Sequence, residues 1–245
     1  MIVALVLLAA VAAGLIQGVT GFGAGIVLMV VLPQLFPVVQ SAGMSQAITV
    51  VLTVVMAWHY RKHVNVRKIV APAVLFIACS WTSLLFANAV DQTVMKLILG
   101  VFLVLLAGYF LFVQQGEVEQ LGMAASLFCI AFSGVCDGMF GIGGPLMVVY
   151  YLFKTESKEE YLGTIQAFFF ICVTAGLGMR LHTGALDLAI WPMIVAGACC
   201  VLCGLAIANR VVEKLNDALV RKLTYWVIGL AGAYNAVASI LALTS

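Results

Sequence analysis

Long apolar runs separated by short polar stretches determine what this chain can fold into. They cover residues 2–36, 41–58, 69–88, 93–113, 121–153, 161–180, 187–208 and 223–243. A helix of about 20 apolar residues crosses the hydrocarbon core of a bilayer, and six of these runs have the length of one such helix. Only 9% of the residues are charged, too few to keep a soluble domain of this size in water. The sequence therefore predicts an all-α polytopic membrane protein.

Two glycine clusters lie inside the first and fifth runs, which are the longest. The first cluster covers Gly18–Gly25, and the second covers Gly134–Pro145. A Phe-Gly-x-Gly motif begins at Phe22 in the first cluster and at Phe140 in the second, 118 residues later. A Leu-Met-Val-Val block follows both motifs at the same distance. Matched blocks at one offset indicate an internal duplication.

The duplication extends beyond the glycine clusters. The dipeptide Gln-Ala occurs at Gln46 and again at Gln166, at a nearly identical offset of 120 residues. We therefore predict one integral membrane domain with an N-terminal repeat over residues 1–115 and a C-terminal repeat over residues 116–245.

Glycine clusters of this density interrupt a helix, because glycine has a high backbone entropy and reaches dihedral angles closed to other residues. Pro145 directly follows Gly144 and suits the first turn of a new helix. We expect each long run to form a re-entrant hairpin of two short helices joined by an unwound turn. Such backbone is tolerated at membrane depth where it is buried in protein or lines a cavity. The alternative is close packing of continuous helices through small residues.

Positive charges favour the hairpin interpretation. If both long runs turn back, ten of the twelve Lys and Arg residues lie on one side, and only Lys96 and Arg180 lie on the other. If all eight runs cross, the two sides hold five and seven, against the positive-inside tendency. A hairpin plus three crossings in each repeat inverts the second repeat relative to the first, which is a recurrent transporter architecture.

At its glycine clusters the sequence resembles the TauE/SafE family of sulfite exporters. The second copy of the family motif, Phe140–Leu146, fits well, whereas the first, Gly21–Gly25, has alanine between its last two glycines. The resemblance implies a multi-pass protein of the bacterial inner membrane that exports or imports sulfite, sulfonates or related sulfur anions. It implies a transporter without enzyme activity, and it leaves the substrate open within that class.

The start of a helix at mid-membrane exposes unpaired N–H groups and a positive dipole end, which together bind anions. Helices starting near Gly25 and Gly144 supply two such ends, and inversion of the repeats brings the ends together. We therefore predict a substrate site at the two turns. The candidate residues are Thr20, Gly21, Gly23, Gly25, Gln46, Gly141, Gly143, Gly144 and Gln166. The alternative role for the two glutamines is a hydrogen bond between helices.

Two ionisable residues accompany these clusters. Asp137 is a carboxylate inside an apolar run, so it is either a proton-coupling residue or a cap for the next turn. If it couples protons, we expect it to be protonated or turned away when an anion is bound. Arg180 ends the sixth run and is either an electropositive entrance or an interfacial anchor, and we favour the anchor. Ser80–Ser83 forms a polar patch in the third run whose direction the sequence does not specify.

The seven cysteines do not indicate a disulfide framework. Cys199, Cys200 and Cys203 have a metal-like or redox-like spacing, but no His or carboxylate is close in sequence. We expect them to be small packing residues, with no metal and no cofactor. A thiol-dependent membrane enzyme is the least favoured alternative.

A proton-linked or potential-driven carrier and an anion channel of the same fold both remain open. The expected partners are a small anion, the lipid bilayer and, for a carrier, a coupling proton. The chain has no GxxxxGK[ST] motif for a nucleotide and no basic stripe for nucleic acid. The direction of transport and the oligomeric state do not follow from these patterns.

Overall fold

The computed structural model describes residues 2–112, 121–211 and 217–244, which form helices and turns without any strand. The first part of the chain contains α1 (Ile2–Thr20), α2 (Ala24–Val31), η1 (Leu32–Gln34), α3 (Val38–His59), η2 (Arg61–His63), η3 (Val66–Lys68), α4 (Val70–Ala87) and α5 (Gln92–Phe112). The second part contains α6 (Met123–Phe140), α7 (Gly144–Lys154), α8 (Lys158–His182), η4 (Leu188–Ile190), α9 (Trp191–Val211) and α10 (Asp217–Thr244).

Within the described residues, eight helices are long and apolar enough to cross a membrane, namely α1, α3, α4, α5, α6, α8, α9 and α10. Their outer faces carry large exposed apolar side chains such as Phe86 and Leu105, which are 71% and 67% exposed. Such a surface suits lipid, because contiguous apolar patches are rare on soluble monomers. The predicted all-α polytopic membrane fold is confirmed.

Both long apolar runs are broken where the glycine clusters lie. The helix ends at Thr20 in the first run and at Phe140 in the second, and α2 and α7 then turn back to pack along α1 and α6. Gly21, Gly23 and Gly141 have φ of 82°, 100° and 65°, a left-handed backbone that L side chains rarely adopt. The predicted glycine turns are therefore present, and continuous helices are excluded at both places.

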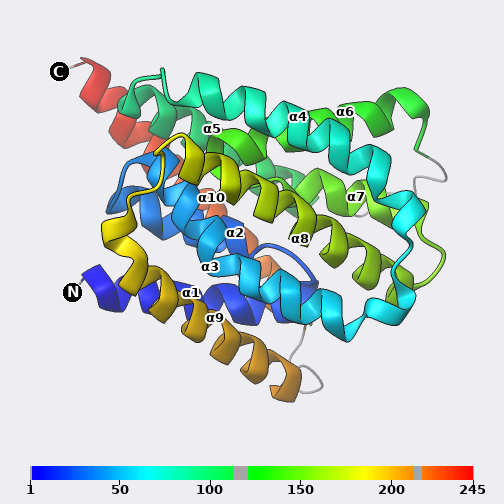
Figure 1. The fold of residues 1–245 in the computed structure, drawn as a ribbon. Helices are drawn as coiled ribbons and strands as arrows, with labels where there is room; N and C mark the ends of the chain where they lie inside the picture. The colour runs from blue at the N-terminus through cyan, green and yellow to red at the C-terminus, as the bar shows by residue number, and fades with distance from the viewer. Residues whose placement is uncertain (1, 113–120, 212–216, 245) are drawn as a thin grey trace.

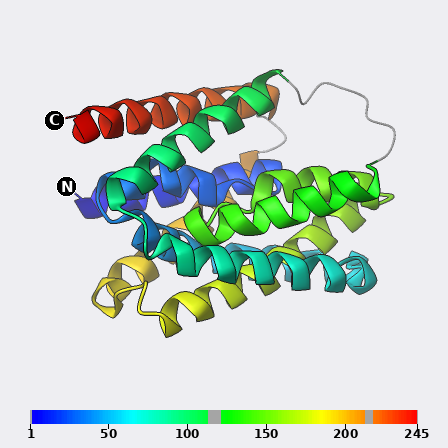
Figure 2. The same cartoon turned by 90° about the horizontal axis from the view of Figure 1, so that it is seen from above.

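The ends of the bundle differ in charge. The connections from α3 to α4 and from α7 to α8 lie at one end, toward which α5 and α9 also run (Figure 1). Both termini and the connection from α8 to α9 lie at the other end, as Figure 2 shows from a second direction. Exposed basic residues at the first end include Arg61, Lys62, Arg67 and Lys154. This arrangement agrees with the topology derived from the positive charges.

The two hairpins point in opposite directions. α2 returns the chain to the end where α1 began, and α7 returns it to the opposite end (Figure 1). α1 and α6 are themselves long enough to span a membrane, so how deeply the hairpins re-enter stays a prediction. The symmetry that relates residues 1–115 to residues 116–245 also stays a prediction.

The two predicted repeats interlock rather than pack as separate bodies. The most extensive helix pairs are α5 with α10, α1 with α9, α4 with α6, and α3 with α8, and each pair joins one repeat to the other. Glycines permit the close approach. A Cβ at Gly134 would meet Phe76 O at 2.5 Å, and a Cβ at Gly204 would lie 2.9 Å from Leu15 N. The buried apolar residues form two clusters, one that includes α4 and α7 and one that includes α1 and α9, and α2 contributes to both.

Candidate functional site

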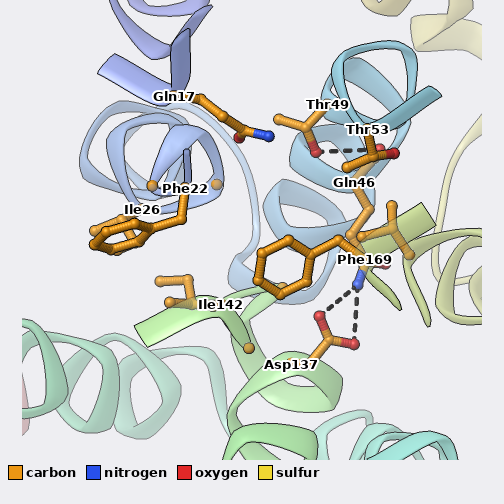
Figure 3. A pocket seen from close by; sticks show the side chains of 15 residues that line it. Gln17, Phe22, Ile26, Gln46, Thr49, Thr53, Asp137, Ile142 and Phe169 are labelled. Carbon is orange, nitrogen blue, oxygen red and sulfur yellow. Dashed lines mark hydrogen bonds between the residues drawn. The ribbon is translucent and has the colours of Figure 1, made fainter. Parts of the chain in front are cut away.

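The two glycine turns line the same cavity, which has a volume of about 60 Å³. Its lining residues come from α1, α2, α3, α6, α7, α8 and the turns between them (Figure 3). They are Gln17, Phe22, Gly23, Gly25, Ile26, Gln46, Thr49, Thr53, Asp137, Gly141, Ile142, Gly143, Gly144, Phe169 and Val173. Residues about 120 positions apart in sequence thus meet at one place.

Most of the predicted site residues lie on this cavity. The lining includes Gly23, Gly25, Gln46, Gly141, Gly143 and Gly144. Thr20, Gly21 and Gln166 are not among the lining residues. The Thr20 hydroxyl bonds to backbone atoms of Ile16 and Phe22, and Gln166 Nε2 donates to Gly21 O. The Thr20 hydroxyl and the Gln166 amide therefore stabilise the first turn, and Gln166 links α8 to this turn rather than to another helix.

Gln17 is a cavity residue that the sequence analysis missed. It lies in α1, is 4% exposed, and its Oε1 accepts a hydrogen bond from Ala24 N at 3.3 Å. Ala24 is the first residue of α2, so the Gln17 side chain caps the helix that follows the turn. A sequence feature could have identified it, because Gln17 is a polar side chain in the apolar run just before the first glycine cluster.

Gln46 and Asp137 join the two repeats at the cavity wall. Gln46 Nε2 donates to both carboxylate oxygens of Asp137, at 3.1 and 3.2 Å, as the dashed lines in Figure 3 mark. Ser80 Oγ donates to Asp137 Oδ2 at 2.9 Å. The carboxylate thus accepts from side chains of α3 and α4 rather than capping its own turn. Ser80, part of the polar patch in the third run, faces α6.

Arg180 is buried at 1% exposure, so its predicted place at an interface or an entrance is wrong. Its Nε donates to Gln46 Oε1 at 2.9 Å, and its Nη2 donates to the carbonyl oxygens of Asp137 and Gly138 at 3.0 and 2.6 Å. Nη1 donates to Val39 O at 3.2 Å. Asp137 O already accepts from Gly141 N at the end of α6, so the guanidinium adds a second donor to it and also satisfies Gly138 O in the last turn of that helix. The sequence prediction for Arg180 relied on its position near the end of an apolar run. That position does not reveal the hydrogen bonds that the guanidinium makes inside the protein.

Of the three cysteines of α9, only Cys200 packs against the apolar core. Cys199 and Cys203 are exposed and Cys200 is partly buried, because the face of α9 that meets α1 carries Val201 and Leu205 instead. The packing interpretation is therefore wrong for Cys199 and Cys203. Within the described ranges, no three His, Cys, Asp or Glu side chains are grouped so that they could hold a metal ion.

Comparison with known protein families shows to which family this chain belongs. A family model described as sulfite exporter TauE/SafE matches residues 6–235, nearly the whole chain. This chain belongs to the TauE/SafE sulfite exporter family. No curated protein and no solved structure gives a significant match. The TauE/SafE match includes both glycine turns and every residue that lines the cavity, so this member is a multi-pass membrane protein of a transporter family.

Proposed function

We propose that this protein is a secondary transporter of a small sulfur-containing anion, such as sulfite or a sulfonate, across the bacterial inner membrane. The substrate binds in the cavity between the two glycine turns, and the protein is not an enzyme. One observation carries the proposal: two sequence-distant turns, both followed by a helix, line the same cavity.

The chemistry of the lining suits an anion. Glycine at both turns lets backbone N–H groups approach a ligand closely, and α2 and α7 direct their amino ends toward the same region. Side-chain amides add donors: Gln17 uses Oε1 to accept from Ala24 N, so its NH₂ group is available to donate. Hydrogen-bond donors of this kind hold an oxyanion while they keep the site free of a fixed net charge.

The size of the cavity sets the size of the substrate. About 10–15 Å³ is needed to hold one water molecule, so a cavity of about 60 Å³ holds roughly four. Sulfite has four heavy atoms, and a short sulfonate has only a few more. Phe22, Ile142 and Phe169 form apolar walls that limit anything longer.

Solute counterflow tests the transport proposal directly. Purified protein is reconstituted into liposomes loaded with unlabelled sulfite, and ³⁵S-labelled sulfite is added outside. We expect transient accumulation of label above equilibrium, because a carrier exchanges bound substrates across the membrane. Flux that never saturates and never exceeds equilibrium would indicate a channel, and absence of flux above protein-free liposomes would contradict the proposal.

A further inference from the structure

Two opposite charges are buried together beside the cavity. Among the Asp, Glu, Lys and Arg residues that the structure describes, only Asp137 and Arg180 are buried, at 3% and 1% exposure. Asp137 lines the cavity, whereas Arg180 lies behind Gln46. Gln46 bridges them, because its Oε1 accepts from the guanidinium and its Nε2 donates to the carboxylate.

None of the other groups that face Asp137 normally changes its charge near neutral pH. α3 presents the Gln46 amide and α4 presents the Ser80 hydroxyl. The thiols of Cys136 on α6 and Cys172 on α8 also interact with the carboxylate, and a thiol is normally neutral at this pH. Arginine stays protonated in proteins. Asp137 is therefore the group of this cluster that can change its charge.

Charge balance then limits how an anion can cross. With Asp137 ionised and Arg180 protonated, the empty site has no net charge. A bound monoanion would add an uncompensated negative charge next to a carboxylate inside the membrane, and such charges are costly there. Transfer of one proton to an Asp137 carboxylate oxygen restores a net charge of zero while the anion is bound.

We propose that Asp137 takes up one proton when a monoanion such as hydrogensulfite or a sulfonate binds, so that the transporter reorients electrically neutral whether it is loaded or empty. This inference rests on the proposed function and selects proton-coupled symport over potential-driven transport. The proton forms an O–H bond on Asp137 when the anion enters and leaves with the anion on the other side. Arg180 fixes the orientation of Gln46, so the amide keeps its N–H group toward the cavity when the carboxylate is neutral.

The first test uses wild-type protein in liposomes and follows ³⁵S-labelled sulfite uptake under two separate gradients. We expect a pH gradient, acidic outside, to drive accumulation. A potassium diffusion potential set with valinomycin should leave the uptake rate unchanged. Uptake that responds to the potential would overturn the inference, even though counterflow would still support the proposed carrier function.

The second test uses Asp137→Asn, which keeps the shape of the side chain but cannot ionise. This variant should still exchange labelled for unlabelled sulfite, whereas accumulation driven by the pH gradient should fall to the level of protein-free liposomes. Asp91→Asn is the matched control, because Asp91 is an exposed carboxylate at the start of α5. It should retain accumulation.

Proton-driven accumulation in Asp137→Asn at the wild-type level would overturn the inference. The purified, monodisperse variant should also bind sulfite, measured as a rise in its thermal unfolding midpoint, and loss of that binding would likewise overturn it. If wild-type protein fails in counterflow, the proposed function itself is wrong.

Discussion

Neighbouring glycines at the second turn differ in what they tolerate. A Cβ at Gly143 would collide with the buried ring of Phe76 and lie 3.0 Å from the Asp137 Cβ. A Cβ at Gly144 would meet nothing closer than Phe169 Cζ at 3.7 Å. Both residues line the cavity, yet only Gly144 can accept a methyl group without moving its neighbours. A substitution at Gly143, such as Gly143→Leu, perturbs the fold as well as the site.

Gly144→Ala is therefore the cleaner probe of the substrate site. The added methyl group takes space from a small cavity and from the approach of an anion to the turn, so we expect sulfite affinity to fall about tenfold, or about 1.4 kcal/mol. Thermal unfolding should stay close to that of the wild type. Gly178→Ala is the control, because Gly178 lies in α8 and no atom lies within 4 Å of the position that its Cβ would take. Unchanged sulfite binding in Gly144→Ala would place the substrate elsewhere.

The two buried charges predict that a second substitution restores stability lost in the first. Arg180→Gln leaves the Asp137 carboxylate without its compensating charge and should destabilise the protein by about 3–5 kcal/mol. Asp137→Asn combined with Arg180→Gln removes both charges, so the double variant should be more stable than Arg180→Gln alone. Thermal unfolding midpoints in detergent measure both effects. Strictly additive losses would show that the two residues act independently.

At the scale of helices, glycine determines which helices can touch. Gly14 and Gly204 let α1 and α9 pack backbone to backbone, since a Cβ at Gly204 would collide with Val11 O. Gly134 and Gly138 do the same for α6 against α4, where Phe76, Ser80 and Ser83 lie in the way of any side chain. Each hairpin is therefore held against the other repeat through its longer helix.

Gly204→Val should separate α1 from α9 and lower the thermal unfolding midpoint. Overpacking of a well-packed contact typically costs about 1–3 kcal/mol, and a collision with backbone leaves little room for relaxation. Gly108→Ala in α5 is the control, because no atom lies within 4 Å of the position that its Cβ would take. Wild-type stability in Gly204→Val, measured by a dye-based melting assay, would contradict this packing.

At the scale of the whole molecule, the direction of each helix decides which loops share a side. The exposed Lys62 and Lys154 lie at the basic end of the bundle, whereas the exposed Asp187 lies at the other end. In a cysteine-free background, Lys62→Cys and Lys154→Cys should react with a membrane-impermeant maleimide only after the cytoplasmic face is exposed. Asp187→Cys should react in intact cells. Labelling of Lys62→Cys and Lys154→Cys from opposite sides would refute the topology.

Features set by local sequence could be predicted, and features set by three-dimensional contact could not. The breaks at Gly21–Gly23 and Gly141–Gly143 follow from glycine density, and their meeting at one cavity agrees with the predicted site. Gln17 was missed because its role depends on a turn that folds back over it. Arg180 was misplaced because its partners are carbonyl groups at the end of another helix, 42 or more residues away in sequence.

The interlocking of the repeats limits how the cavity can open alternately to each side. The four most extensive helix contacts each join one predicted repeat to the other, so the repeats cannot separate as two rocking lobes without breaking these four contacts. For the proposed carrier, we therefore expect moving bodies that are composites, each built from helices of both predicted repeats, such as α1 with α9 or α6 with α4. Displacement of one hairpin would then be coupled to a partner helix whose nearest residue is at least 36 positions away in sequence, as for α4 and α6.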